Sequence, residues 1–419
     1  MADELLQTAL RKIEETEVPR VEVAALAYSG GLDSSLCVEL LRRKYKAKKI
    51  YPIMVDVGQG EEEIRTGLEK AKVLGVDVIL IDAKDEFTEE WMAKAIMANS
   101  DYMGYPVSTS MTRQLIARKV AEKAVELGAD ALVEGSTGKG NDQYRMHNVF
   151  TLFAPGRKII VPVRDFNLTR SEEEALCRAW GIPVTETIPG GDDKTMWCRS
   201  IASGAIDLNQ EIPDEVWMWY VPPEKAPDEP TVVELEYERG LPVALNGERM
   251  PLKELVPKLN VIAGRNAVGK IDIFEEGIMN LKSRELYEAP AATVILKTHR
   301  DLEQMCLTKE ELMFKKMVEQ RWAYMVYHGE WFHPLREALD AFIEKTQEMV
   351  NGTVRVKLYK GNVDIIYRDA PTSLFSPEIR SIKAAGFDQR VCADAAKVRG
   401  LLFEVLAKRE QVLREKGLR

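Results

Sequence analysis

The stretch YSGGLDSS, at residues 28–35, is the most informative part of the sequence about the fold. An apolar run rich in Val and Ala precedes it at residues 21–27, and an apolar segment with charged edges follows at 36–41. This order predicts a strand, a tight turn and the start of a helix. Gly30 and Gly31 let a ligand approach the backbone, while the first helical turn offers unpaired N–H groups and the positive end of its dipole to an anion. The stretch therefore predicts a phosphate-binding loop, with an ordinary glycine-rich turn as the alternative.

Alternating strands and helices follow this loop. Strand-like runs lie at 50–57, 76–81, 131–134 and 159–163, with helical patterns between them. Such alternation predicts an α/β fold, a doubly wound parallel sheet that binds ligands at the carboxyl ends of its strands. Thr169 and Glu172 predict a capping box for a helix that ends near Trp180. Beyond Pro183 the alternation stops, and later segments alternate in the manner of antiparallel strands, with a hairpin predicted around Lys360 between 353–359 and 363–367.

These patterns divide the chain into four expected parts. Residues 1–20 form an amphipathic helical extension, and 21–184 form the phosphate-binding α/β domain. Residues 185–392 form an α+β domain, and 393–419 form a C-terminal helix with an apolar stripe from Val398 to Leu413. A terminal helix with such a stripe either docks on its own domain or joins a neighbouring chain.

A second glycine-rich stretch, residues 135–145, follows the fourth strand. Its Thr, Lys, Asn, Asp and Arg residues supply donors, acceptors and both charges at one strand end, which favours a substrate site over a plain polar loop. A third stretch, 264–270, resembles a Walker loop, but Ile271 stands where a Mg²⁺-binding Ser or Thr is needed. We interpret that stretch as a connection between a helix and a strand.

The composition narrows the possible partners. The chain has 419 residues and a net charge of −9, which argues against nonspecific binding to nucleic acid or to an anionic membrane. No signal peptide or membrane-spanning run is expected. The five Cys form no CxxC pair, which favours reduced thiols in a cytoplasmic protein over disulfides or a structural metal.

Several motifs in order resemble the argininosuccinate synthase family, within the ATP-pyrophosphatase superfamily. They are AYSGGLDSS at 27–35, VDVGQ at 55–59, YPVSTSMTR at 105–113, STGKGNDQYR at 136–145, RSIASG at 199–204, GRNAVGKIDIFE from 264 and LKSRELYEAP ending at 290. The resemblance covers roughly residues 24–400. It implies an ATP-dependent ligase that joins citrulline to aspartate through a citrullyl-AMP intermediate. It also implies ATP as a substrate with Mg²⁺, no redox cofactor, and a homotetramer built by a synthetase and multimerisation domain.

The resemblance assigns roles to individual positions. The positions that match ATP-binding residues are Ala27, Tyr28, Ser29, Gly30, Gly31, Leu32, Asp33, Ser34, Ser35, Val55 and Gly135. The positions that match aspartate-binding residues are Thr137, Asn141 and Asp142. The positions that match citrulline-binding residues are Tyr105, Ser110, Asn141, Arg145, Gly191, Ser200, Glu275 and Tyr287. Asp33, Asp142 and Arg145 are predicted to act in catalysis, by orienting substrates and stabilising charge without a covalent nucleophile. The ligands of the expected Mg²⁺ are not identified.

The chain departs from the family pattern near the predicted citrulline site. Gly191 replaces a serine of the family, Thr195 replaces an asparagine, and Met146-His147 replaces a Phe-Glu pair. Ala202-Ser203 also departs from the family's Glu-Cys. Two alternatives therefore stay open: a paralogue that joins aspartate to a different ureido or amide acceptor, and a non-catalytic nucleotide-binding assembly protein.

Overall fold

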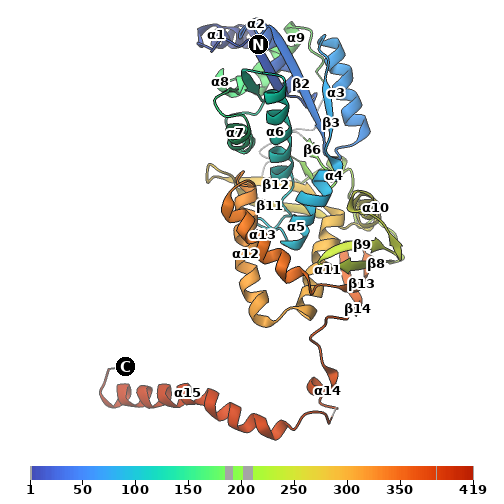
Figure 1. Cartoon of the computed structure of the whole chain (residues 1–419), viewed down its shortest axis with the longest axis vertical. Coiled ribbons are helices and arrows are strands. Elements are labelled where there is room, and N and C mark those ends of the chain that lie inside the picture. The colour runs from blue at the N-terminus through green and yellow to red at the C-terminus, as the bar shows by residue number, and fades with distance from the viewer. Residues whose placement is uncertain (1, 185–191, 202–210, 384, 419) are drawn as a thin grey trace. The chain divides into compact units, whose positions relative to one another are not determined.

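The computed structural model describes residues 2–184, 192–201, 211–383 and 385–418 (Figure 1). Its contacts divide the chain into two units, residues 1–372 and 373–419, and each is described here by itself. No described helix combines the length and the apolar character needed to cross a membrane. The four-part division expected from the sequence stays a prediction.

A parallel sheet organises the N-terminal part of the first unit. Its five described strands are β1 (Val23–Ala27), β2 (Lys49–Asp56), β3 (Ile79–Asp82), β4 (Ala131–Val133) and β5 (Lys158–Ile160), in the order β3-β2-β1-β4-β5. The central strand β1 pairs in parallel with both neighbours, and Ala24 lies between Ile50 and Ala131. The α/β fold class is confirmed.

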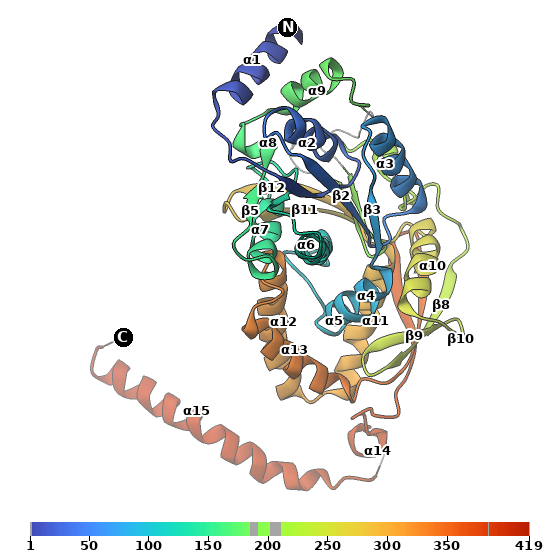
Figure 2. The same ribbon diagram turned by 45° about the horizontal axis from the view of Figure 1, so that its top comes forward.

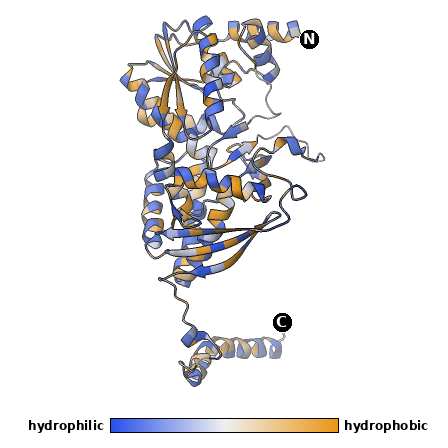
Figure 3. Ribbon diagram, turned by 90° about the vertical axis from the view of Figure 1, so that its right-hand side faces the viewer, coloured by the Kyte–Doolittle hydropathy of each residue, from blue (hydrophilic) through white to orange (hydrophobic). Residues whose placement is uncertain are grey.

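Helices cover both faces of this sheet because alternate strand residues point to opposite sides. Ala24 and Leu26 pack with α2 (Leu32–Arg43), α3 (Glu61–Val73), α8 (Pro162–Asp165) and α9 (Arg170–Ala179). Ala25 packs on the other side, with α6 (Thr109–Glu126) and α7 (Asp142–Phe153). Figure 2 shows these two layers, and Figure 3 shows the strands as largely apolar runs, as expected for a sheet buried on both faces.

The N-terminal helix α1 (Ala2–Glu15) packs on the α/β layer. Ala9 and Ile13 belong to the same buried cluster as β1 and α2. Lys12 donates to Glu172 of α9 at 2.7 Å, and Glu172 also completes the capping box with Thr169 that the sequence predicts. The extension is thus tied by apolar contacts and by an ion pair to the layer that carries the phosphate loop.

Two antiparallel sheets complete the first unit. One has the order β10-β9-β8-β13-β14 and the other the order β11-β12-β7-β6. Their strands are β6 (Asp192–Lys194), β7 (Arg199–Ile201), β8 (Thr231–Glu238), β9 (Leu241–Leu245), β10 (Glu248–Arg249), β11 (Lys270–Glu276), β12 (Lys282–Glu288), β13 (Gly352–Tyr359) and β14 (Asn362–Asp369). The hairpin predicted around Lys360 is formed by β13 and β14.

The remaining helices of this unit surround these sheets. They are α4 (Lys84–Glu86), η1 (Phe87–Met92), α5 (Ala93–Met97), η2 (Asp214–Val216), α10 (Leu252–Arg265), α11 (Pro290–Cys306), α12 (Lys309–Tyr327) and α13 (Pro334–Gln347). The Walker-like stretch at 264–270 runs from the end of α10 to the start of β11. It is therefore the predicted connection between a helix and a strand.

The second unit contains α14 (Pro377–Arg380), η3 (Gln389–Val391) and α15 (Cys392–Glu415). The long C-terminal helix predicted from the sequence is present. Taken by itself, this unit leaves Val398, Leu402 and Val405 of α15 at least 61% exposed. A stripe of this kind is a surface that can pack against another element.

The fold predicts that Gly30 is intolerant of substitution. Its φ is +78°, and a Cβ there would lie 2.3 Å from Cα of Gly67 on α3. Gly75 is the matched control, because its φ is +62° but a Cβ would meet nothing within 4 Å. We expect Gly75→Ala to lower the free energy of unfolding by about 1–2 kcal/mol, and Gly30→Ala by about 3 kcal/mol or more. Urea unfolding measures both, and equal losses would mean that the loop and α3 can separate.

Candidate active site

A cavity of about 220 Å³ lies at the carboxyl ends of β1, β2 and β4. The predicted residues that line it are Ala27, Tyr28, Ser29, Asp33, Ser34, Val55, Gly135 and Asp142. The lining residues that were not predicted to bind a substrate are Met54, Val57, Gln59, Glu63, Thr112, Arg113, Ile116, Glu134, Ser136, Met146, Asp193 and Lys194. This edge includes the point between β1 and β4 where the strand order reverses, which is where open α/β sheets bind ligands.

The loop after β1 holds the start of α2 open toward this cavity. The N-cap residue is Gly31, which has no side chain with which to cap the helix. The backbone N–H of Gly31 donates to Oγ of Ser29 at 3.2 Å, and the hydroxyls of Ser29 and Ser34 lie 3.2 Å apart. The first-turn N–H groups and these hydroxyls form a donor set suited to an anion. Gly30, Leu32 and Ser35 belong to the same turn without lining the cavity.

The loop after β4 packs directly on the phosphate loop. A Cβ on Gly135 would lie 3.1 Å from the backbone nitrogen of Ser34, so a glycine allows this close approach. Glu134 is buried and accepts hydrogen bonds from the backbone N–H of Ser136, at 2.7 Å, and from its hydroxyl. Burial raises the pKa of Glu134. Thr137 lies farther along this loop, where its carbonyl accepts from Gly140 at 3.4 Å, and it does not line the cavity.

A chain of alternating charges leads out of the cavity. Asp142 accepts from Nε of Arg113 at 2.8 Å and from Nη1 of Arg145 at 2.8 Å. Arg113 also pairs with Asp193 of β6. Although burial raises the pKa of Asp142, the two guanidinium groups lower it below its usual value. Asp142 is therefore an ionised carboxylate held between two fixed cations.

Arg145 connects this chain to a second cluster of predicted residues. Its Nε donates to the carbonyl oxygen of Tyr327 at 2.9 Å, and its guanidinium lies 4.8 Å from the centre of the Tyr327 ring. The Tyr327 hydroxyl donates to Oε1 of Glu275 at 2.5 Å and accepts from Nδ2 of Asn141 at 2.8 Å. Tyr327 therefore contacts three residues predicted to bind citrulline, which come from α7 and β11.

The other predicted citrulline residues surround this cluster. The Tyr287 hydroxyl donates to Oε2 of Glu275 at 2.9 Å, and the Tyr287 ring stacks on Tyr105 with centroids 4.0 Å apart. Ser200 of β7 lies opposite Tyr287 in the strand ladder. Ser110 of α6 is buried, and its hydroxyl has no hydrogen-bond partner among the described residues. A buried hydroxyl of this kind suits a ligand contact.

The residues that depart from the family pattern lie in different parts of the structure. Gly191 and Ala202-Ser203 lie outside the described residues. Thr195 stabilises the turn after β6, because its hydroxyl accepts from the backbone N–H groups of Trp197 and Cys198 at 3.1 Å. Met146 lines the cavity, and His147 is exposed.

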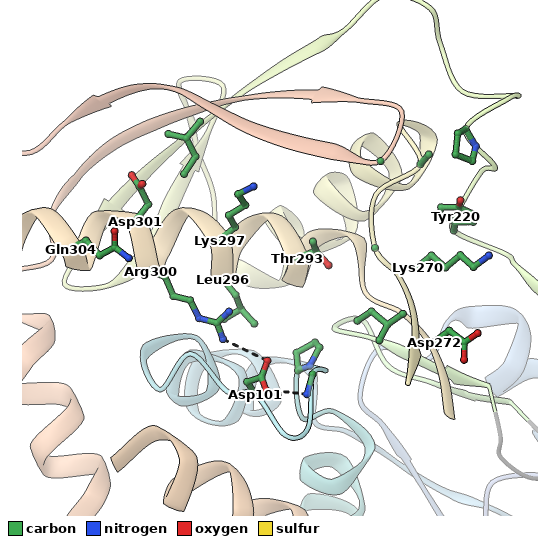
Figure 4. Close-up of a pocket in the computed structure, with 18 residues that line it drawn as sticks. Asp101, Tyr220, Lys270, Asp272, Thr293, Leu296, Lys297, Arg300, Asp301 and Gln304 are labelled. Carbon is green, nitrogen blue, oxygen red and sulfur yellow. Dashed lines mark hydrogen bonds and ion pairs between the residues drawn. The ribbon is translucent and has the colours of Figure 1, made fainter. Parts of the chain in front are cut away.

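A larger cavity, of about 870 Å³, contains none of the predicted site residues. Figure 4 shows Lys297, Arg300 and Gln304 along α11 on one side of it, with Asp101 opposite. Arg300 lies 3.8 Å from Asp101. Asp272 and Asp301, which also line this cavity, pair with Arg284 and Arg368. Because its carboxylates already have cationic partners and no predicted residue lines it, its larger volume does not make it the active-site candidate.

Two important residues of the site were missed by the sequence reasoning. Arg113 is the last residue of the quoted motif YPVSTSMTR, so its place in that motif is a signal that could have identified it. Tyr327 lies at the end of a helix far from every quoted motif, and no local signal separates it from a core tyrosine. Only the fold brings it between Asn141 and Glu275.

The fold and site define a class: α/β proteins with a ligand cavity at the carboxyl edge of a parallel sheet. The family model described as "Arginosuccinate synthase N-terminal HUP domain" matches residues 23–183, and "Arginosuccinate synthase C-terminal domain" matches 191–406. The chain belongs to the argininosuccinate synthase family.

Individual relatives match over most of their length. The chain is 48% identical to an argininosuccinate synthase of Methanopyrus kandleri, covering 90% of this chain and 96% of the relative. It is 47% identical to that of Methanocaldococcus jannaschii, covering 93% and 99%. A solved structure, the U34-tRNA thiolase NcsA of Methanococcus maripaludis with its [4Fe-4S] cluster, aligns at 17% identity and a TM-score of 0.30 over 44% of this chain and 66% of that one. That last alignment carries no argument about function.

The site predicts a role for the Tyr327 hydroxyl. Tyr327→Phe keeps the ring that stacks on Tyr102 and lies against Arg145, but it removes the donor to Glu275. A hydrogen bond to a charged group contributes about 1.5–3 kcal/mol, so we expect the KM for citrulline to rise about tenfold to a hundredfold. Tyr324→Phe, on the exposed side of the same helix, is the control. Steady-state kinetics measure both, and an unchanged KM in Tyr327→Phe would remove its hydroxyl from the citrulline site.

Proposed function

We propose that this protein uses ATP to join citrulline to aspartate, forming argininosuccinate, AMP and pyrophosphate as a step of arginine biosynthesis. The observation that carries the proposal is the position of Asp142. Its carboxylate faces the cavity below the phosphate loop and also pairs with Arg145, which leads to the predicted citrulline cluster. Three substrates can then meet around one short chain of charges, as an orientation mechanism needs.

The proposed reaction has two steps. The ureido oxygen of citrulline attacks the α-phosphorus of ATP, so that a carbon–oxygen–phosphorus link forms and the α–β phosphate bond breaks, which releases pyrophosphate. The aspartate amine then attacks the activated carbon, AMP leaves with the ureido oxygen, and the amine loses a proton to solvent. The N-terminal turn of α2 and Arg113 would stabilise negative charge on the phosphates. The Glu275 carboxylate would bind the citrulline α-ammonium, supported by the other groups of the Tyr327 cluster.

Mg²⁺ would accompany ATP and neutralise part of its phosphate charge. In the part of the chain that the structure describes, no group of three or more His, Cys, Asp or Glu could hold a metal ion. Mg²⁺ that accompanies a nucleotide takes its ligands largely from phosphates and water, so the proposal places it on the phosphates of ATP. We propose the cytoplasm as the compartment, supported by five free cysteines, four of them buried.

The direct test measures pyrophosphate release with ATP, aspartate and a panel of ureido acceptors. We expect release with citrulline, and we expect Asp33→Ala to lose at least about a hundredfold in rate because the loop loses a side chain that helps to position the ATP phosphates. Asp77→Ala, at an exposed position before β3, is the control for the substitution itself. Circular dichroism would show whether each variant keeps the fold.

Other outcomes of this test identify the alternatives. Release with another ureido compound but not with citrulline would indicate a paralogue, and gain of citrulline activity in Gly191→Ser would locate the change. Binding of ATP without release with any acceptor would indicate a nucleotide-binding assembly protein. Wild-type release in Asp33→Ala would remove that carboxylate from the mechanism.

We propose a homotetramer in which α15 of each chain packs on a neighbouring chain. The exposed apolar stripe of α15 supports this, because burying several apolar side chains against another chain is energetically favourable.

Truncation after Arg399 tests this role of α15. We expect the truncated protein to form assemblies of lower mass, measured by light scattering. The control, Glu410→Gln, changes a charge on the same helix but no apolar residue. An unchanged assembly after truncation would contradict this role of α15.

A further inference from the structure

Two residues of α9 lie beside the phosphate-loop carboxylate of Asp33, and neither of them lines the cavity. Arg170 and Glu173 lie three positions apart, so they share a helix face. Nη1 of Arg170 donates to Oδ1 of Asp33 at 2.7 Å. Helix α9 packs on α2, the helix whose first turn contains Asp33, so this contact links two elements of one buried layer.

Glu173 is the unusual member of this group. It is 1% exposed, and its Oε2 has no hydrogen-bond donor among the described residues. The neighbouring carboxyl group is that of Asp33, which is an acceptor when ionised. The Asp33 side chain is 33% exposed, so Glu173 is the more buried of the two. When two carboxyl groups lie this close, the more buried one binds a proton more readily, and it can then donate a hydrogen bond to the other.

The surroundings favour a proton on Glu173. Burial and the negative charge of Asp33 raise the pKa of Glu173 to about 10. The positive charge of Arg170 lowers the pKa of Glu173, but the Arg170 side chain is about half exposed and its guanidinium already pairs with Asp33. The other titratable groups near Glu173 are Glu174, Cys37 and Cys177, none of them a cation. Asp33 therefore has a cation on one oxygen and a neutral acid beside it.

We propose that Glu173 is a positioning residue, whose neutral carboxyl donates a hydrogen bond to Asp33 and, with Arg170, fixes that carboxylate in the phosphate loop. The inference rests on the proposed function, because it assigns Asp33 to the nucleotide site. Asp33 lines the cavity beside the open first turn of α2. A short carboxylate at this position can turn back onto the free N–H groups of its own helix and compete with the phosphates. Two contacts from α9 hold it away from that position.

Three variants test this role. Glu173→Gln keeps a neutral donor of similar size, whereas Glu173→Leu keeps the volume and removes the donor. We expect the Kd for ATP and the KM for ATP to stay within about twofold of wild type in Glu173→Gln, and to rise about tenfold or more in Glu173→Leu. The KM values for citrulline and aspartate should stay unchanged. Glu344→Leu, at an exposed position of α13, is the control for the substitution itself.

The readouts separate a positioning role from a structural one. A role in packing alone predicts a lower melting temperature in Glu173→Leu with no selective effect on ATP, and that result would overturn the proposal. Equal losses of ATP affinity in Glu173→Gln and Glu173→Leu would also overturn it, because the neutral donor would then be irrelevant. Glu173→Met gives the same comparison if Glu173→Leu reduces the yield of folded protein.

Calorimetry without an acceptor measures the Kd for ATP alone, so it tests the role of Glu173 separately from the proposed function. A wild-type protein that binds ATP but forms no product from citrulline would overturn the proposed function alone, and the Kd comparison would still decide the role of Glu173. A wild-type protein that binds no ATP would overturn both.

Discussion

The pairing of β1 with β2 on one side and β4 on the other is the constraint on which the site depends. Because all three strands are parallel, their carboxyl ends meet at one edge, and the loops after β1 and β4 lie in contact. Glycines allow two close approaches at this edge: Gly135 lies against Ser34 where the two loops meet, and Gly30 lies against Gly67 of α3. The same edge leaves the first turn of α2 facing the cavity. The position of the strands therefore determines where an anion can bind.

A chain of ion pairs and hydrogen bonds connects the cavity at the parallel sheet with the antiparallel part of the unit. Asp142 begins α7 and pairs with Arg113 of α6 and with Arg145, one turn farther along α7. Arg145 reaches Tyr327 at the end of α12, and Tyr327 reaches Glu275 of β11. These buried polar groups satisfy one another, which favours a single arrangement of helices and strands around them. The two predicted ligand regions are thus held together by one network.

The layer behind the phosphate loop contributes to the same site. Arg170 and Glu173 of α9 face Asp33, while Glu172 of the same helix caps its own start and pairs with Lys12 of α1. One helix therefore connects the N-terminal extension, the α/β core and the loop carboxylate. Neither α1 nor α9 lines the cavity, but α9 contacts the loop carboxylate directly and α1 contacts α9.

The amino-acid sequence predicted the α/β fold class and the order of strand, turn and helix around the phosphate loop. Local signals are enough for this, since apolar runs, glycine turns and the Thr169 capping box act over a few residues. The exact ends differ, because β1 begins at Val23 and α2 begins at Leu32, within the quoted stretch. The sequence also indicated Asn141, Arg145, Glu275 and Tyr287 through their motifs. Tertiary packing is what brings Asn141, Arg145 and Glu275 into contact with Tyr327. It also brings Tyr287 to Glu275 and Glu173 to Asp33. Tyr327 lies 52 residues from Glu275 and 186 residues from Asn141 in the sequence, and Glu173 and Asp33 lie on separate helices. The direction of a buried side chain depends on the neighbours that pack around it, and no local sequence pattern specifies those neighbours.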